Sequence, residues 1–421
     1  MSSGSADSAV AALGHLERIV RTWLGLRASA PVHVPPLPDR LSRLLLRDEE
    51  CERPDQRDRW GRWEFEFSEN YQAGRLWVPE VDEWVSAKRA ELAGSVELEP
   101  LWPDGRRFAV CLTHDVDMVS RQATPRQIAR AVRLGLGARG YRSQHERVWA
   151  ARALARAARF RLARVPSCTE TLERCLAIEE DAGVVASYFF TVYPPARPSP
   201  YDCVYAFSDE CLFRGQRRSV RGVVRAVAED GFDVGLHGGY HTAHDVSALA
   251  AEKDALETAA GREVTSTRQH YLHWDVRTTP ILHEAVGLRA DSTLGFNRNV
   301  GFRAGTSLPF RLWNSDAMRT LDVVEVPLVL QDGALLGADG LDLEPAEAQG
   351  IVERILASVA DVSGVVTILV HPHVLVRDDV ADLYRGAIEQ ALGAGAWVTS
   401  LREIDRWWRS REQRLLEGHP S

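Results

Sequence analysis

Two stretches of the chain carry side chains of the types that bind divalent metals. His237 and His241 lie four residues apart at the end of an apolar run. Two imidazoles at this spacing face the same side of the chain if the segment turns helically. Imidazole is the commonest metal ligand, and such a pair needs a carboxylate to complete a site. Asp115 and Asp117 offer carboxylates at the end of another apolar run. We therefore expect the two run ends to meet around a divalent metal.

The elements that must position these residues follow from the hydrophobic pattern. From Arg107 onward, short β-rich runs alternate with helical segments. This alternation predicts βαβ units and a parallel sheet. Roughly six to eight such units in about 300 residues suit a closed (β/α) barrel better than an open sheet. The fold class predicted is therefore α/β, with a (β/α) barrel.

Polar groups follow strand after strand in this pattern. Besides the two aspartates and two histidines, the expected strand ends carry Arg268, His270, Asp291, His371 and His373. The carboxyl ends of parallel strands gather on one face of such folds, where their sites lie. This recurrence is the strongest indication of function in the sequence.

Composition bounds the remaining possibilities. The chain has 421 residues, a formal net charge of −8 and 45% hydrophobic residues, as in an ordinary globular protein. An acidic balance gives no general reason to expect nucleic acid or an anionic membrane as a partner. We see neither a signal peptide nor an apolar run near the roughly 20 residues of a membrane helix, so a cytoplasmic enzyme is expected. The six cysteines are scattered and are expected to be reduced.

Three regions are expected. Residues 1–103 form an N-terminal accessory region, residues 104–410 the barrel, and residues 411–421 a tail. The accessory region contains an amphipathic helix, a proline-rich link and an aromatic segment at 60–84, whose rings either pack on the barrel or form a wall for a sugar ring. Arginine-rich helices at 121–164 form either a solvated face or a docking surface for an acidic partner or phosphorylated substrate.

The motifs also carry a family resemblance. From about Arg107 to Trp397 the chain resembles the polysaccharide deacetylases of the NodB-homology type (carbohydrate esterase family 4), in an Asp-x-Asp variant. The family's first motif is matched by Thr113-His-Asp-Val-Asp117 and its second by His237-Gly-Gly-Tyr-His241. The third, fourth and fifth are matched at Arg268, Asp291 and His371. The usual Thr-Phe-Asp-Asp of the first motif becomes Thr-His-Asp-Val-Asp, which separates the two acids by one residue.

The resemblance implies a deformed (β/α) barrel with an N-terminal helical and aromatic-rich extension. It also implies a role for each matched residue. Asp117, His237 and His241 would bind the metal, with zinc the first expectation and other first-row metals acceptable. Asp115 would be the general base and His371 the acid, with His373 as its competitor. Arg268 would pair with Asp115 and orient it, and Asp291 would do the same for His371.

Further side chains are candidates for contact with a small-molecule or glycan substrate, namely His270, Tyr271, Trp274, Arg303 and His373. Among them Arg303, like Arg298, is a candidate to contact an anionic group. The expected activity is removal of an acyl group, expected to be acetyl, from the nitrogen of an amino sugar or glycan intermediate. The alternatives are hydrolysis of a non-sugar amide, or an inactive barrel that serves as a binding module. The sequence decides neither the substrate nor the oligomeric state.

Overall fold

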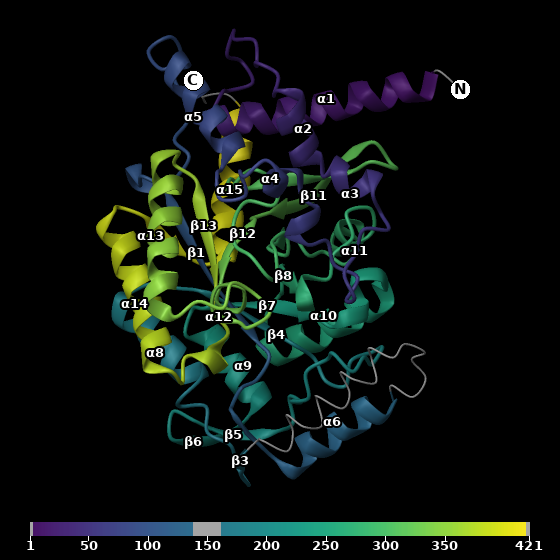
Figure 1. The fold of residues 1–421 in the computed structure, drawn as a ribbon, viewed down its shortest axis with the longest axis vertical. Coiled ribbons are helices and arrows are strands. Elements are labelled where there is room, and N and C mark those ends of the chain that lie inside the picture. Colours follow the sequence, from purple (N-terminus) through teal and green to yellow (C-terminus); the bar gives the residue numbers. More distant parts are fainter. Residues whose placement is uncertain (1–2, 138–160, 418–421) are drawn as a thin grey trace.

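A curved, mainly parallel sheet forms the centre of the computed structural model, which describes residues 3–137 and 161–417 (Figure 1). Its strands follow the order β10-β11-β9-β8-β7-β4-β1-β13-β12, and β14 also pairs with β1. These strands are β1 (Ala109–Val116), β4 (Ser187–Phe190), β7 (Asp233–Gly238), β8 (Ser266–Gln269), β9 (Ala290–Asp291), β10 (Phe310–Asn314), β11 (Arg319–Glu325), β12 (Leu328–Gln331), β13 (Val365–Leu369) and β14 (Trp397–Thr399). Two small sheets pair β2 (Gln122–Ala123) with β3 (Arg161–Leu162) and β5 (Glu210–Phe213) with β6 (Gln216–Ser219).

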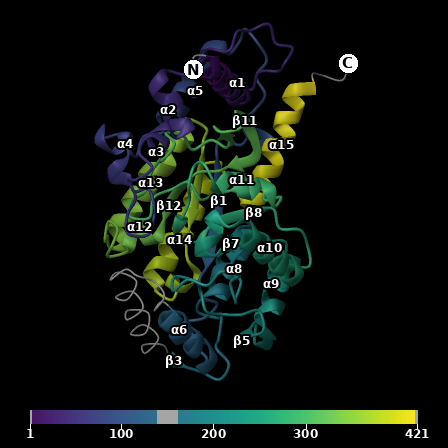
Figure 2. The same cartoon turned by 90° about the vertical axis from the view of Figure 1, so that its right-hand side faces the viewer.

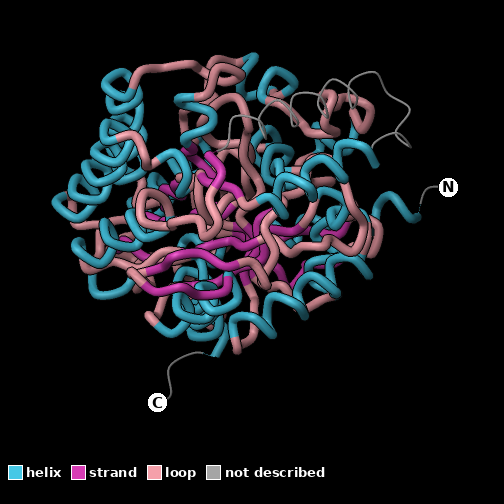
Figure 3. Tube along the Cα trace, turned by 90° about the horizontal axis from the view of Figure 1, so that it is seen from below, coloured by secondary structure: helices cyan, strands magenta, loops and turns pink. Residues whose placement is uncertain are grey.

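Helices surround this sheet, as the view from below shows (Figure 3). The helices that follow the first strand are α6 (Pro125–Gly137), α8 (Leu172–Ala182), α9 (Val220–Glu229), α10 (Val246–Ala260), α11 (Thr279–Ala285), α12 (Asp332–Leu336), α13 (Pro345–Asp361), α14 (Asp378–Gly393) and α15 (Leu401–Glu417). The preceding helices are α1 (Ser3–Leu24), α2 (Asp39–Leu46), α3 (Asp48–Glu52), α4 (Glu69–Gln72) and α5 (Glu80–Leu92). The prediction of an α/β fold with strands and helices in alternation is confirmed.

The barrel is incomplete. Every described pairing in the large sheet is parallel except that between β10 and β11. The edge strands β10 and β12 do not pair with each other in the part of the chain that the structure describes. One edge is an antiparallel hairpin rather than a further βα unit, so the sheet curls without closing. The fold is therefore a deformed (β/α) barrel. The expectation of a fully closed barrel is wrong.

The two faces of β1 pack into two different hydrophobic clusters. All eight of its residues are buried. Val110 and Leu112 join an apolar cluster with α8, α9, α13 and α14, whereas Ala109 and Cys111 join a second cluster with the N-terminal helices. This division follows from the alternation of side chains along a strand. Burial on both faces also explains why the strand reads as a continuous apolar run.

The N-terminal region and the last helix close one end of the molecule together (Figure 2). Trp23 is fully buried and its indole N–H donates to the carbonyl of Pro309 at 2.8 Å. In α15, Leu415 is buried and its carbonyl accepts the backbone N–H of Ala28 at 2.7 Å. The expected boundary at residue 411 falls inside this helix, because Arg411 and Leu415 are buried there. The prediction of a separate tail that begins at residue 411 is therefore wrong for the described residues, which extend to 417.

Most of the arginine-rich stretch at 121–164 lies outside the described residues. Within the described part, Arg130 of α6 pairs with Asp209 at 2.5 Å rather than facing only solvent. None of the described helices is long and apolar enough to cross a membrane.

Candidate metal and hydrolytic site

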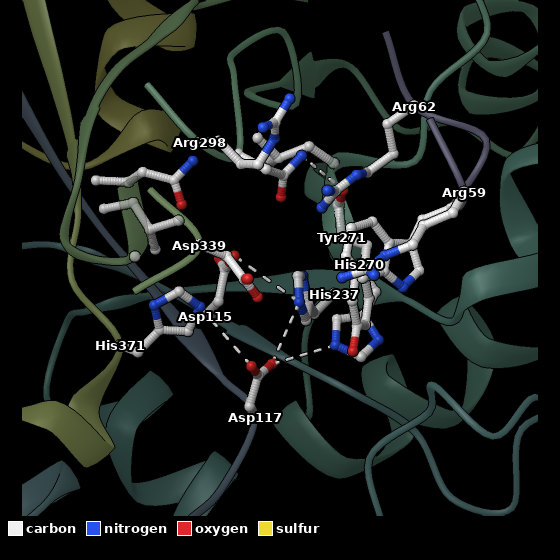
Figure 4. Close-up of a pocket in the computed structure, with 16 residues that line it drawn as sticks. Arg59, Arg62, Asp115, Asp117, His237, His270, Tyr271, Arg298, Asp339 and His371 are labelled. Atoms are coloured by element: carbon white, nitrogen blue, oxygen red, sulfur yellow. Dashed lines mark hydrogen bonds and ion pairs between the residues drawn. The ribbon is translucent and has the colours of Figure 1, made fainter. Parts of the chain in front are cut away.

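The carboxylate of Asp117 lies among three histidines, just beyond the carboxyl end of β1 (Figure 4). Its Oδ1 is 3.4 Å from Nε2 of His237 and 3.6 Å from Nε2 of His270. Its Oδ2 is 3.7 Å from Nε2 of His371. Burial alone would raise the pKa of Asp117, but the neighbouring histidines hold it well below its ordinary value. The group is therefore an anion that faces several nitrogen atoms.

His237 is oriented by the strand beside it. Because β7 and β8 pair in parallel with His237 opposite Arg268, the imidazole Nδ1–H reaches the carbonyl of Arg268 and donates to it at 2.9 Å. That bond leaves Nε2 as the nitrogen that faces Asp117. Metal-binding histidines commonly donate their second ring N–H to such a carbonyl, which fixes the tautomer and the ring.

The spacing of these atoms fits a metal ion. Two ligand atoms that each lie roughly 2.1 Å from one tetrahedral ion are about 3.4 Å apart. The separations of 3.4 and 3.6 Å from Asp117 to His237 and His270 match that value. One carboxylate oxygen and two imidazole nitrogens form the mixed donor set that first-row metals accept.

His270 is a further imidazole beside Asp117 that the motif did not identify as a ligand. Among the described residues, Asp117, Cys203 and His270 form a group whose ligand atoms all lie within 4.8 Å of one another, and neither His237 nor His241 is in such a group. The His241 ring instead lies against Tyr240, with ring centroids 5.3 Å apart. The spacing argument assumed a helical turn from His237. However, His237 is still on strand β7, and only Tyr240–His244 turns, as a 3-10 helix.

Gly238 and Gly239 are required because a side chain at either position would clash with neighbouring groups. They are not required by an unusual backbone conformation. Neither has a positive φ. A Cβ on Gly238 would lie 2.6 Å from Oγ1 of Thr242, and a Cβ on Gly239 would lie 2.9 Å from Oε1 of Glu252. The Gly239 N–H donates to Glu252 at 2.9 Å, and the next N–H donates to Asp202, also at 2.9 Å. Buried carboxyl groups thus hold the backbone just after His237.

Arg268 contacts Asp115, as the sequence predicts. Its Nη1 is 3.1 Å from Oδ1 of Asp115, and its Nε donates to the carbonyl of Ser292 at 2.7 Å. The guanidinium is fully buried, so its geometry is fixed by these bonds. The other oxygen of Asp115 lies 3.8 Å from Nε2 of His237, on the side of the candidate metal site.

His371 is oriented by Asp332, not by Asp291. The Nδ1–H of His371 donates to Oδ1 of Asp332 at 2.7 Å, and the His371 backbone N–H donates to the other oxygen at 3.0 Å. Burial would lower the pKa of His371, but the carboxylates of Asp332, Asp117 and Asp115 raise it to about 10. Asp291 is fully buried and instead lies 3.2 Å from Nδ1 of His283. The role expected for Asp291 is thus corrected, because β9 ends beside α11 rather than beside β13.

A cavity of about 580 Å³ opens above these groups. Of the residues predicted to contact substrate, His270 and Tyr271 line it, whereas Trp274, Arg303 and His373 do not. Trp274 and Arg303 are fully buried, and Arg303 donates to both oxygens of Glu50 at 2.8 Å. Their expected substrate contacts are therefore wrong: both belong to the packing of the N-terminal region on the barrel.

Sequence reasoning missed several groups at this site. Asp332 and Cys203 contact His371 and Asp117, and the cavity is also lined by Arg59, Trp60, Arg62, Asn297, Gln331 and Asp339. Arg298, expected to contact an anionic group, lines the cavity too. Asp332 directly follows strand β12, so the rule that site residues follow strand ends could have identified it. The residues at 59–62 lie in the accessory region, where no strand pattern pointed to them.

No family model matches the chain, and no curated protein matches it. Solved structures do match the chain. A Mycobacterium smegmatis protein described as a polysaccharide deacetylase is 21% identical, with a TM-score of 0.49, over 77% of this chain and 100% of that one. The Puue allantoinase is 14% identical, with a TM-score of 0.45, over 75% and 95% of the two chains. The Bacillus subtilis peptidoglycan deacetylase PdaC is 12% identical, with a TM-score of 0.31, over 74% and 96%.

Proposed function

We propose that the chain is a metal-dependent hydrolase that removes an acyl group, most simply acetyl, from the amide nitrogen of an amino sugar or glycan intermediate. The observation that supports this most is that Asp115 lies beside His237 and His371 lies beside Asp117, and that all four residues line one cavity. An acid and a base that flank a metal-ligand set are what amide hydrolysis requires. The resemblance of the motifs to those of NodB-type deacetylases points to the same chemistry.

Asp117 and His237 are proposed metal ligands, and the third is either His241, which the motif indicates, or His270, whose Nε2 lies 3.6 Å from Asp117. Zinc suits one oxygen and two nitrogen ligands, and other first-row metals suit them as well. When bound, such a metal polarises the amide carbonyl and lowers the pKa of water. Cys203 also contacts Asp117, since its thiol donates to Oδ1 at 3.7 Å.

Two residues of the chain move protons in this proposal. Asp115, held by Arg268, accepts the proton of the attacking water at Oδ2, the oxygen that faces the ligand set. His371, kept cationic by Asp332, donates the proton from Nε2 to the departing amine nitrogen. The amine then leaves uncharged or takes a further proton from solvent, and the acyl group leaves as the carboxylate.

The experiment that tests this function measures metal content and amide hydrolysis together. Wild-type protein supplemented with zinc should retain about one metal ion and release acetate from one of a panel of N-acetylated amino sugars. Asp115→Asn should keep the metal and lose about a hundredfold or more of the activity. Arg385→Gln, on the exposed face of α14, is the control and should change neither. Failure to retain metal, or equal activity of Asp115→Asn and wild type, would reject the proposal.

A further inference from the structure

The cavity has two chemically different ends. Figure 4 shows Asp117 at one end and the side chains of Arg59, Arg62 and Arg298 at the other. All three arginines line the cavity. Two come from the N-terminal region and one from the loop after β9, so the far end of the cavity exists only because this region packs on the barrel.

The guanidinium groups at this end are held in place from behind. Buried Glu64 lies between two of them, with Oε1 3.1 Å from Nη2 of Arg62 and Oε2 3.5 Å from Nε of Arg298. Arg62 also pairs with Asp58 at 2.8 Å, and Arg298 with Glu66 at 2.5 Å. None of these three carboxylates lines the cavity, whereas the guanidinium groups do. The cavity therefore meets N–H donors at this end and not the acids that fix them.

Arg59 supplies charge that is not neutralised. It is exposed and forms no ion pair with any residue that the structure describes. Its guanidinium lies over the ring of Trp60, 3.8 Å from the centroid, and that of Arg62 lies 4.5 Å from the same centroid. Trp60 thus keeps two guanidinium groups together at the mouth of the cavity.

Hydrogen bonds hold the loop that carries Arg59 and Arg62 and tie it to the site. Oδ1 of Asp58 accepts the backbone N–H groups of Trp60 and Arg62, at 2.8 and 2.9 Å. The carbonyl of Trp60 accepts the hydroxyl of Tyr240, at 2.9 Å, from within the motif that contains His237. A donor cluster fixed in this way is organised before a ligand binds, which reduces the entropy lost on binding.

We propose that the substrate carries an anionic group, a carboxylate or a phosphate, that binds Arg59, Arg62 and Arg298 while its amide reaches the floor of the cavity. The planar guanidinium fork matches both anions. A cavity of about 580 Å³ has the size that holds one small ligand. The substrate class is therefore an acylated amine, such as an amino sugar, with a negative charge at a distance from the amide. This inference rests on the proposed hydrolase function.

The test compares substrates that differ only in charge. N-acetylglucosamine is the neutral probe, its 6-phosphate carries a phosphate, and N-acetylmuramic acid carries a carboxylate. We expect at least one anionic probe to have a kcat/KM about tenfold or more above that of the neutral probe, mainly through a lower KM. The two anionic probes distinguish the two sources of charge. This preference should weaken with added salt, because Arg59 is exposed.

Variants assign the preference to the arginines. Arg59→Gln should reduce the ratio of anionic to neutral kcat/KM about tenfold, and Arg59→Lys should restore part of it, since lysine keeps the charge without the fork. Arg385→Gln removes one exposed arginine elsewhere and should leave the ratio unchanged. Equal kcat/KM for all three probes, or a ratio that Arg59→Gln does not alter, would overturn the inference.

A separate measurement distinguishes this inference from the proposed function. If no probe is hydrolysed, the proposed function fails on this panel. Calorimetry with Asp115→Asn then tests the anion site on its own. Tighter binding of an anionic probe than of N-acetylglucosamine, lost in the double variant with Arg59→Gln, would support the site. Equal binding of neutral and anionic probes, or none, would overturn it.

Discussion

The imidazole of His371 donates from Nδ1 to Oδ1 of Asp332 at 2.7 Å, while its Nε2 faces Asp117 at 3.7 Å. The ring is thereby fixed between an orienting carboxylate and the candidate metal site. Asp332 also accepts the His371 backbone N–H, so one buried carboxylate sets both the position and the charge of the proposed acid.

Asp332→Asn is expected to move the pH dependence of activity. Asp332, together with Asp117 and Asp115, raises the pKa of His371 to about 10, so His371 is cationic near pH 7. The amide of asparagine removes that charge, the pKa of His371 falls, and the protonated acid is lost at lower pH. We expect the alkaline limb of kcat to move to lower pH and kcat at pH 8 to fall about tenfold or more. His373→Ala, which does not line the cavity, should leave the limb in place. If the alkaline limb of kcat did not move in Asp332→Asn, the role of Asp332 toward His371 would be excluded.

Metal analysis should separate the two candidates for the third ligand. His237→Ala and His270→Ala are expected to lose most of the bound metal, because each removes a nitrogen within 3.6 Å of Asp117. His241→Ala is expected to retain it, because its ring lies against Tyr240. Bound metal per protein, measured by mass spectrometry after dialysis, decides between them. Metal loss in His241→Ala with retention in His270→Ala would restore the assignment made from the motif.

Glu252 should make the protein less stable as pH rises. Burial, with a contribution from Asp202, raises the pKa of Glu252 in the folded protein to about 8, above its ordinary value of 4.5. Between these pH values the folded state holds a proton that the unfolded state has released, so the free energy of unfolding falls as pH increases. The loss reaches a few kcal/mol at most.

Glu252→Gln tests this directly, since its amide oxygen can still accept the Gly239 N–H. Urea unfolding at pH 5, 7 and 8.5 should show a smaller loss of stability in this variant than in wild type. Glu257→Gln, on the same helix at a more exposed position, provides the comparison and should keep the wild-type slope. Parallel slopes for wild type and Glu252→Gln would show that Glu252 is ionised in the folded state.

A buried ion pair beneath the site is expected to stabilise the fold. His114 Nε2 lies 2.5 Å from Oε1 of Glu179, and its Nδ1–H donates to the carbonyl of Val370 at 2.7 Å. Burial would lower the pKa of His114, but Cys175 and Glu179 raise it well above its ordinary value. Removing one partner leaves the other charge buried, which costs about 3–5 kcal/mol in comparable cases.

The test is a double-mutant cycle of His114→Phe and Glu179→Gln, in which the free energy of unfolding in urea is measured for each variant. Each single variant should be strongly destabilised, and the double variant should lose less than the sum of the two. Strict additivity would mean that the two side chains stabilise the protein independently.

The sequence alone determined the parallel architecture and most of the site's floor. The apolar runs 108–112, 232–236 and 365–370 were recognisable as strands, because the observed strands 109–116, 233–238 and 365–369 are buried on both faces. The rule that polar groups follow strand ends then identified Asp115, Asp117, His237 and His371. The contact between Arg268 and Asp115 also followed, since both lie at the same edge of the sheet.

Only the tertiary structure decided which side chains meet. Spacing within the motif favoured a helical turn from His237 to His241, but His237 is still extended on strand β7. Asp291 and Asp332 both follow strands, and only the strand order places Asp332 beside His371. Arg59 and Arg62 reach the cavity because the N-terminal region packs on the barrel through contacts more than 200 residues apart, such as that between Glu50 and Arg303. Local pattern carries no information on such contacts, because they depend on how separate apolar surfaces pack together.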